Sequence, residues 1–157
     1  MPPTYVVGDL WDELPRADVI LVTTNATLNA KNELIMGRGA ALEAAQRYPR
    51  LPYWLGKELL KRNAVGKLYG IMGIGRQNDS NALIGAFQVK CHWRDDARLE
   101  IVAFSAGQLM EIAAVYQRIA LNCPAIGNRR LAARDVVSIL SPLPSHVYIY
   151  TKEPLCS

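Results

Sequence analysis

The chain has 157 residues, of which 50% are hydrophobic and 20% charged, and its formal net charge is +4. This length suits one domain that buries about two thirds of its unfolded surface, so no disulfide or metal is needed to hold it together. The high apolar fraction and modest charge exclude an intrinsically disordered chain. No apolar run reaches the roughly 18 residues of a membrane span, and the first residues lack the features of a signal peptide. We therefore expect no membrane partner.

Cysteine and histidine are too scattered along the sequence to predict a metal site. The cysteines are Cys91, Cys123 and Cys156, and the histidines are His92 and His146. No C-x-x-C pair or other zinc-ligand spacing occurs among them. Free thiols are typical of a reducing compartment, so we expect a cytoplasmic protein with neither a metal nor a cofactor. The positive charge favours an anionic partner, such as a nucleotide or a nucleic acid, or serves solubility alone.

The predicted elements alternate between strands and helices along the chain. Strands are expected over residues 6–10, 17–24, 67–74, 82–89, 119–121 and 147–151, and helices over 39–47, 53–62, 99–117 and 131–140. Pro49 ends the first helix, and Gly107 weakens the third by about 1 kcal/mol relative to alanine. Alternation of this kind predicts an α/β domain with a mixed, partly parallel sheet. No linker divides residues 1–157, so a single domain is expected.

Ligands of open α/β sheets bind beyond the carboxyl ends of the strands, where this sequence places unusual residues. Asp9 follows the first strand. It either caps a turn or accepts a hydrogen bond from an exocyclic amine such as the adenine N6. Residues 36–41, Met-Gly-Arg-Gly-Ala-Ala, open a helix. Their glycines either let the backbone approach an anion at the helix N-terminus or allow tight packing of the helix.

Two later junctions also carry chemically capable side chains. Lys90 ends an apolar strand and is either a solvated lysine or a functional amine that burial would activate. We expect His92 to be a hydrogen-bonded structural residue and Trp93 to lie in the core. Residues 124–131 contain Gly127 and two arginines, which either form an anion-binding turn or a plain surface turn. Two Gly-containing loops, each ahead of a helix, suggest a ligand with two phosphates or a long anion.

Taken together, these segments resemble the macrodomain family nearly end to end. The resemblance is carried by Gly8-Asp9-Leu10, Ala17-Asp18-Val19-Ile20 with Thr23-Thr24-Asn25, Met36 to Ala41, Pro124 to Leu131 and Val147-Tyr148-Ile149-Tyr150. It implies a three-layer α/β fold in which a mixed central sheet is flanked by helices. The Met-Gly-x-Gly-x-Ala loop and the Lys-Cys-His-Trp-Arg stretch over residues 90–94 are similar to one branch of the family. That branch contains terminal ADP-ribose glycohydrolases and DNA ADP-ribosyl glycohydrolase antitoxins.

The resemblance also implies roles for individual residues. It assigns Asp9 to the adenine, Asn25 to the distal ribose and Lys90 to ribose C1″, so that Lys90 and Asn25 are the implied catalytic residues. The two Gly-containing loops would bind the diphosphate. The implied ligand-binding residues are Asp9, Leu10, Thr24, Met36, Gly37, Arg38, Gly39, Ala40, His92, Ala125, Ile126, Gly127, Asn128, Arg129, Arg130 and Tyr150.

The implied function is an ADP-ribosyl glycohydrolase, which binds ADP-ribose and removes it from a DNA base or a protein side chain. Its partner would be ADP-ribose or an ADP-ribosylated substrate, and Arg94, Arg129 and Arg130 favour a nucleic acid. The second loop lacks the family's Gly-x-Gly and the aspartate that members with a covalent lysine mechanism place there. Two alternatives therefore stay open, a non-catalytic binder of ADP-ribose or a related NAD-derived signal, and an ADP-ribose 1″-phosphate phosphatase.

Overall fold

The computed structural model describes residues 2–76, 81–124 and 131–155. The predictions made for Ala125, Ile126, Gly127, Asn128, Arg129 and Arg130 lie outside the described residues. The described strands are β1 (Thr4–Val7), β2 (Val19–Thr24), β3 (Ile71–Arg76), β4 (Leu83–Gln88), β5 (Ile119–Asn122) and β6 (Val147–Thr151). The helices are the 3-10 helix η1 (Leu10–Glu13) and the α-helices α1 (Gly39–Arg47), α2 (Leu51–Lys61), α3 (Leu99–Ala113) and α4 (Ala133–Leu140).

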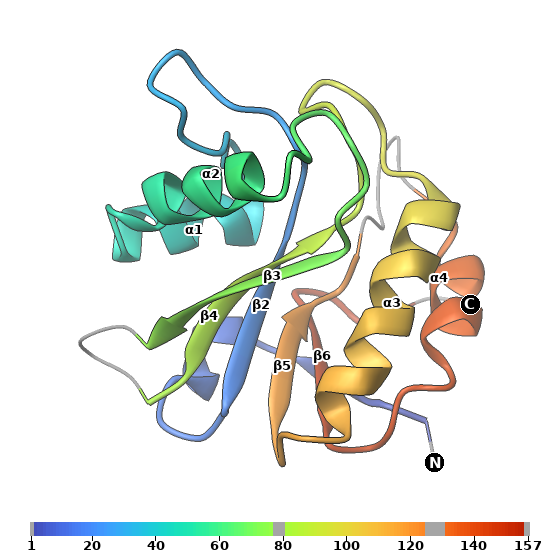
Figure 1. The fold of residues 1–157 in the computed structure, drawn as a ribbon. Helices are drawn as coiled ribbons and strands as arrows, with labels where there is room; N and C mark the ends of the chain where they lie inside the picture. The colour runs from blue at the N-terminus through green and yellow to red at the C-terminus, as the bar shows by residue number, and fades with distance from the viewer. Residues whose placement is uncertain (1, 77–80, 125–130, 156–157) are drawn as a thin grey trace.

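The strands form one mixed sheet in the order β1-β6-β5-β2-β4-β3. All neighbouring strands pair in parallel except β3 and β4, which are antiparallel. Helices α1 and α2 cover one face of the sheet, and α3 and α4 cover the other (Figure 1). The predicted α/β class and its three layers are thereby confirmed.

Alternating side chains of the central strand β2 divide the apolar core into two clusters. Ile20 and Val22 pack on the side of α1 and α2, whereas Val19 and Leu21 pack on the side of α3 and α4. Successive side chains of a strand point to opposite faces, so an apolar run without alternation is what a strand covered on both faces requires. The run over 19–22 therefore builds both layers of the core.

The parallel strands bring distant segments of the chain to one edge of the sheet. Parallel strands point the same way, so their carboxyl ends share an edge. The residues that follow β1, β2, β4 and β5 are Gly8, Asn25, Val89 and Cys123. The loops expected to bind a ligand therefore start from a common edge.

Strand β3 begins at Ile71 instead of the predicted residue 67, because a buried amide occupies the preceding backbone. The Gln88 side-chain oxygen accepts hydrogen bonds from the N–H groups of Tyr69 (2.7 Å) and Gly70 (3.0 Å). Its Nε2 donates to the carbonyl of Lys67 (2.8 Å). The Gln88 side chain thus forms hydrogen bonds with backbone groups that would otherwise pair with a neighbouring strand.

Helix α3 ends at Ala113, four residues before its predicted end. The backbone N–H groups of Gln117 and Arg118 instead donate to the carboxylate of Asp18, both at 3.0 Å. The helix therefore stops where an acidic side chain captures the N–H groups that would have continued it.

Gly56 marks a close approach between α2 and the loop that precedes α1. A Cβ atom at this position would lie 2.1 Å from the backbone carbonyl oxygen of Asn32. We expect Gly56→Ala to lower the free energy of unfolding by about 1–3 kcal/mol, because backbone must shift to admit the methyl group. Urea denaturation measures this change.

Gly107 provides the matched control within α3. A Cβ atom there meets no heavy atom within 4 Å. Gly107→Ala should raise the free energy of unfolding by about 1 kcal/mol through helix propensity alone. Equal stabilities for Gly56→Ala and the wild-type protein would contradict the packing described here.

Candidate functional site

Two adjoining cavities lie along the edge where the parallel strands end. The lysine cavity, of about 450 Å³, is named for Lys90, and the tyrosine cavity, of about 540 Å³, is named for Tyr150. Each falls within the range of roughly 300–1,000 Å³ that is typical of small-molecule sites. The residues that line both cavities are Gly39, Ala40, Asn122 and Cys123. Because they share these residues, the two cavities adjoin one another, and together they are called the cleft.

The N-terminus of α1 lies where the two cavities meet. Gly39 opens the helix with a φ of +55°, which favours glycine, and the preceding Arg38 is extended. Among the described residues no side chain caps this helix end, and its first turn contains no acidic residue. Backbone N–H groups of a first helical turn lack intrahelical partners and carry partial positive charge. The middle of the cleft is therefore suited to an anion such as a phosphate.

Asn122 joins the ends of two neighbouring strands beneath the cleft. Its side-chain oxygen accepts from the backbone N–H of Thr23 (3.0 Å), and its Nδ2 donates to the Thr23 hydroxyl (2.9 Å). These two bonds fix the end of β5 to the end of β2. Asn122 and its neighbour Cys123 line the cleft although neither was predicted as a site residue. Asn122 ends a buried strand and Cys123 follows it, which is the signal that could have found them.

Cys123 does not supply a reactive thiolate to the cleft. Burial raises the pKa of its thiol to about 12. Since the thiolate is the nucleophilic form of cysteine, this side chain remains protonated and unreactive near neutral pH. Cys123 contributes packing and shape to the cleft.

Asn25 lines the lysine cavity with an amide that its own loop holds in place. Its Oδ1 accepts from the backbone N–H of Thr27 (2.8 Å), and its Nδ2 donates to the carbonyl of Ile35 (2.9 Å). The residue is 6% exposed. Its amide is therefore preorganised before any ligand arrives.

Thr24 also lines this cavity, but its hydroxyl points into a buried network. The Tyr69 hydroxyl donates to the carbonyl of Asn25 (2.7 Å) and lies 2.6 Å from the Thr24 hydroxyl. A tyrosine hydroxyl has one proton, so Thr24 is the donor in the second bond. Thr24 therefore supports the loop from below.

Lys90 lies two residues beyond the end of β4 and is half-buried. Its Nζ donates to the carbonyl of Trp93 (3.0 Å), so the amine is held against its own loop. The buried Gln88 side chain donates to the backbone carbonyl of Lys90 (3.2 Å) and anchors the segment. The lysine is therefore neither deeply buried nor freely solvated.

The expectation that Trp93 lies in the core is wrong, because the chain turns away from the sheet after Lys90. Trp93 is 42% exposed and lines the lysine cavity. The Arg94 guanidinium lies 4.8 Å from the centre of its ring, and the His92 ring stacks against it at 6.2 Å. His92 is exposed, lines neither cavity and accepts a hydrogen bond from the backbone of Arg94 (3.2 Å).

The structure brings together most of the predicted site residues that it describes. Those that line the cleft are Asp9, Leu10, Thr24, Asn25, Gly37, Arg38, Gly39, Ala40, Lys90 and Tyr150. Met36 lines neither cavity and is buried in the core cluster under α1 and α2. The lysine cavity also contains Asp95, the one carboxylate among its lining residues in the described part of the chain. Asp95 was not predicted, since it follows no strand directly.

Asp9 both caps η1 and lines the tyrosine cavity. Its Oδ1 accepts from the backbone N–H of Trp11 (3.0 Å), so the expected capping role is confirmed. The carboxylate is exposed at the cavity wall. A capping carboxylate retains further acceptor sites, so capping and ligand recognition are compatible.

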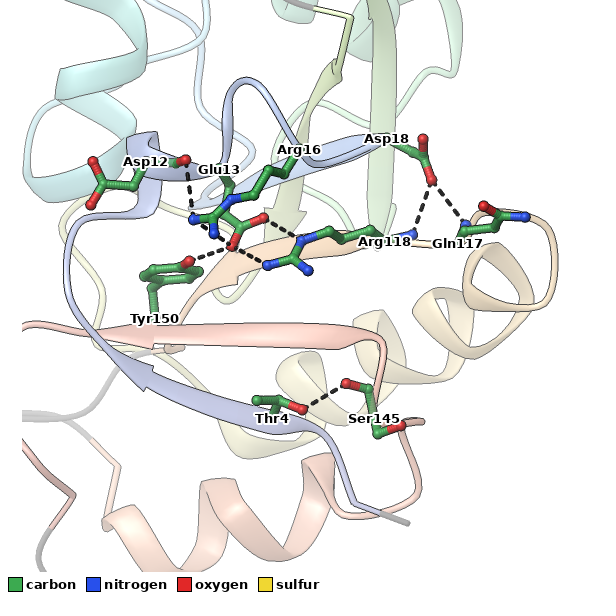
Figure 2. A network of polar contacts seen from close by, with 9 residues as sticks. All are labelled: Thr4, Asp12, Glu13, Arg16, Asp18, Gln117, Arg118, Ser145 and Tyr150. Carbon is green, nitrogen blue, oxygen red and sulfur yellow. Dashed lines mark hydrogen bonds and ion pairs between the residues drawn. The ribbon is translucent and has the colours of Figure 1, made fainter.

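A buried carboxylate, that of Glu13, contacts Tyr150, which also lines the tyrosine cavity (Figure 2). Glu13 is 0% exposed, and Arg118 binds both of its oxygens, through Nε at 2.8 Å and Nη2 at 2.9 Å. The Tyr150 hydroxyl donates to Oε2 of the same carboxylate. Burial alone would raise the pKa of Glu13, but the hydrogen bonds from Arg118 and Tyr150 hold it below its usual range. Burial and the bond to Glu13 raise the pKa of Tyr150 to about 12.

By sequence, no protein-family profile and no curated protein matches this chain. By structure, it is similar to the macrodomain of Thermus aquaticus DarG, at 22% identity and a TM-score of 0.73, over 96% of this chain and 97% of the other. The macrodomain of Mycobacterium tuberculosis DarG is 29% identical, with a TM-score of 0.69 over 96% and 97% of the two chains.

A third similar structure is Thermosipho africanus DarTG in complex with ADP-ribose. It is 17% identical, with a TM-score of 0.72, over 96% of this chain and 42% of the other. The resemblance to macrodomains is thus confirmed, and the chain has the macrodomain fold. No helix among the described residues is long and apolar enough to cross a membrane.

The lowered pKa of Glu13 predicts an acid-dependent loss of stability. A carboxyl whose pKa is depressed by folding stabilises the protein above its unfolded pKa, and that contribution is lost as the pH falls through the folded value. From about pH 5 downward, the free energy of unfolding should therefore fall more steeply in the wild-type protein than in Glu13→Gln. At pH 7 the variant should be less stable by about 1–3 kcal/mol. Urea denaturation across pH measures both effects, and parallel pH profiles would contradict this ionised state of Glu13.

Proposed function

We propose that this chain binds ADP-ribose along the cleft and hydrolyses its bond to a macromolecule, with residues 1–157 acting as a single macrodomain. The observation that carries the proposal is the order of groups along the two adjoining cavities. They lead from the carboxylate of Asp9 past the N-terminus of α1 to the amine of Lys90. ADP-ribose presents matching groups in the same order: an adenine, a diphosphate and a distal ribose. The macrodomain fold and the ADP-ribose complex of the similar DarTG structure support the match.

The tyrosine cavity accommodates the adenosine end of the ligand in this proposal. Asp9 accepts a hydrogen bond from the adenine N6 amine, for which an exposed carboxylate is suited. Tyr150, protonated near neutral pH, provides an aromatic wall. The diphosphate lies over Gly39 and Ala40, where the backbone N–H groups at the start of α1 neutralise its charge.

The lysine cavity accommodates the distal ribose and the bond to be broken. Asn25 orients the ribose, since its amide is already fixed by the loop. Lys90 acts at C1″ in one of two ways: it forms a Schiff base with the opened ribose, or it stabilises charge as the bond breaks. Hydrolysis also requires a group that exchanges protons with water and with the leaving group. Asp95, a carboxylate of the same cavity, is the side chain we assign to that task.

The first prediction of the proposal concerns binding. Titration calorimetry should show binding of ADP-ribose, and Asp9→Ala should weaken it by at least about 1 kcal/mol, or roughly fivefold, through the lost bond to the adenine. Asp12→Ala is the matched control, because Asp12 is an exposed acid of the same 3-10 helix that does not line the cleft. Its affinity should equal that of the wild-type protein. The absence of binding heat at millimolar ADP-ribose would overturn the proposal.

The second prediction concerns hydrolysis. The wild-type protein should release ADP-ribose from ADP-ribosylated DNA or from ADP-ribosylated protein side chains, and the net charge of +4 favours DNA. Lys90→Ala should abolish release, and Asp95→Asn should slow it by roughly 10²–10⁴-fold. Lys67→Ala is the control, since Lys67 is exposed and lies outside both cavities.

The same release assay separates the alternatives. Trapping by borohydride would support the Schiff base, and release without trapping would support charge stabilisation. Binding of ADP-ribose without turnover of any substrate would identify a binder of an NAD-derived signal. Turnover of ADP-ribose 1″-phosphate alone would identify a phosphatase. Full activity in Lys90→Ala would remove this lysine from the mechanism.

A further inference from the structure

Helix η1 joins Asp9, which lines the tyrosine cavity, to Glu13, which contacts a second lining residue, Tyr150. Asp9 caps the start of this single 3-10 turn and lines the cavity directly. Glu13 ends the turn, is fully buried and lies outside the lining of both cavities. It reaches the cleft through the hydroxyl of Tyr150, which lines the cavity from β6 (Figure 2).

The carboxylate of Glu13 is itself held at both of its oxygens. Arg118, which immediately precedes β5, donates two parallel hydrogen bonds to it, one to each oxygen. Paired bonds between a guanidinium and a carboxylate fix the relative orientation of both groups. The Arg118 guanidinium also lies 3.8 Å from the centre of the ring of Tyr148, a residue of β6. This contact restrains the guanidinium further. The group that accepts the hydrogen bond of the Tyr150 hydroxyl is therefore itself oriented by Arg118.

We infer that Glu13 is a positioning residue for ligand binding: together with Arg118 it fixes the ring of Tyr150 against the adenine end of the cleft. This inference rests on the proposed binding of ADP-ribose. The hydroxyl lies at the far end of the ring, so a hydrogen bond there restrains the side chain about its Cα–Cβ bond and fixes the place of the buried ring against the cavity. Ordering a side chain when a ligand binds costs conformational entropy. Because the Tyr150 side chain is already ordered, that cost is smaller. Glu13 therefore raises affinity without touching the ligand.

The arrangement also explains why an ionised side chain is buried here. A buried ion pair is weak support for stability, because the cost of desolvation offsets most of the attraction. At this place it does something that an apolar pair could not. The Glu13 carboxylate accepts a hydrogen bond from the Tyr150 hydroxyl. The positions of Asp9 and Tyr150 therefore both depend on the single turn of η1.

A double-mutant cycle tests the inference. With ADP-ribose in titration calorimetry, Glu13→Gln and Tyr150→Phe should each weaken binding about five- to tenfold, and the double variant should be no weaker than the worse single variant. Both changes act through the same bond: Tyr150→Phe removes its donor, and Glu13→Gln removes the charge and the paired Arg118 contact that orient its acceptor, so their effects should not add. Ribose 5-phosphate, which has no adenine, should bind with unchanged affinity in an NMR titration, a result that general loosening of the structure would not give.

Tyr148→Phe is the matched control for this cycle. Tyr148 lies on the same strand, two residues from Tyr150, and lies beside the same guanidinium, but it does not line the cleft. Removal of the Tyr148 hydroxyl should leave the affinity for ADP-ribose unchanged. If Glu13→Gln fails to fold, Arg118→Lys replaces it, because lysine keeps the charge but not the paired geometry.

The outcomes separate this inference from the function on which it rests. Additive losses in the cycle, or wild-type affinity in Tyr150→Phe, would overturn the positioning role while the binding of ADP-ribose stands. An equal loss of affinity for ribose 5-phosphate would also overturn it. Failure of the wild-type protein to bind ADP-ribose would overturn the proposed function and this inference together.

Discussion

The parallel pairing of the strands is the constraint on which the candidate site depends. Strands β1, β6, β5, β2 and β4 run in one direction, so the chain leaves the sheet repeatedly at the same edge. An apolar core on each face holds the strands in register. Asp9 and Lys90 are separated by 80 residues of sequence. They lie along one cleft because the strands that precede them end at the same edge.

Hydrogen-bonded polar side chains convert this edge into a defined cleft. Gln88 holds the segment before β3 and the backbone of Lys90, and Asn122 fixes the end of β5 to that of β2. Glu13 does the same for the wall that contains Tyr150. Each of these groups has bonding partners for its polar atoms, which buried polar groups require. These side chains therefore hold the loops of the cleft in place, and two of them, Gln88 and Glu13, do not line it.

Much of this arrangement could be predicted from the sequence, and the exceptions share a physical cause. Helix α1 was expected over 39–47 and strand β6 over 147–151, and both have those bounds, because apolar spacing and a following proline or turn define them. The start of β3 and the exposure of Trp93 were not predictable. The start of β3 depends on hydrogen bonds from the side chain of Gln88, and the exposure of Trp93 depends on a turn of the chain. The local order of apolar and polar residues contains neither piece of information. The roles of Asn25 and Lys90 in chemistry stay predictions.

A crystal structure of the protein with ADP-ribose bound tests the assignment of the two cavities directly. We expect the adenine beside Asp9 and Tyr150, the diphosphate over the first turn of α1, and the distal ribose between Asn25 and Lys90. A ligand bound outside this cleft, or lying in it with the adenine beside Lys90, would contradict the assignment of both cavities.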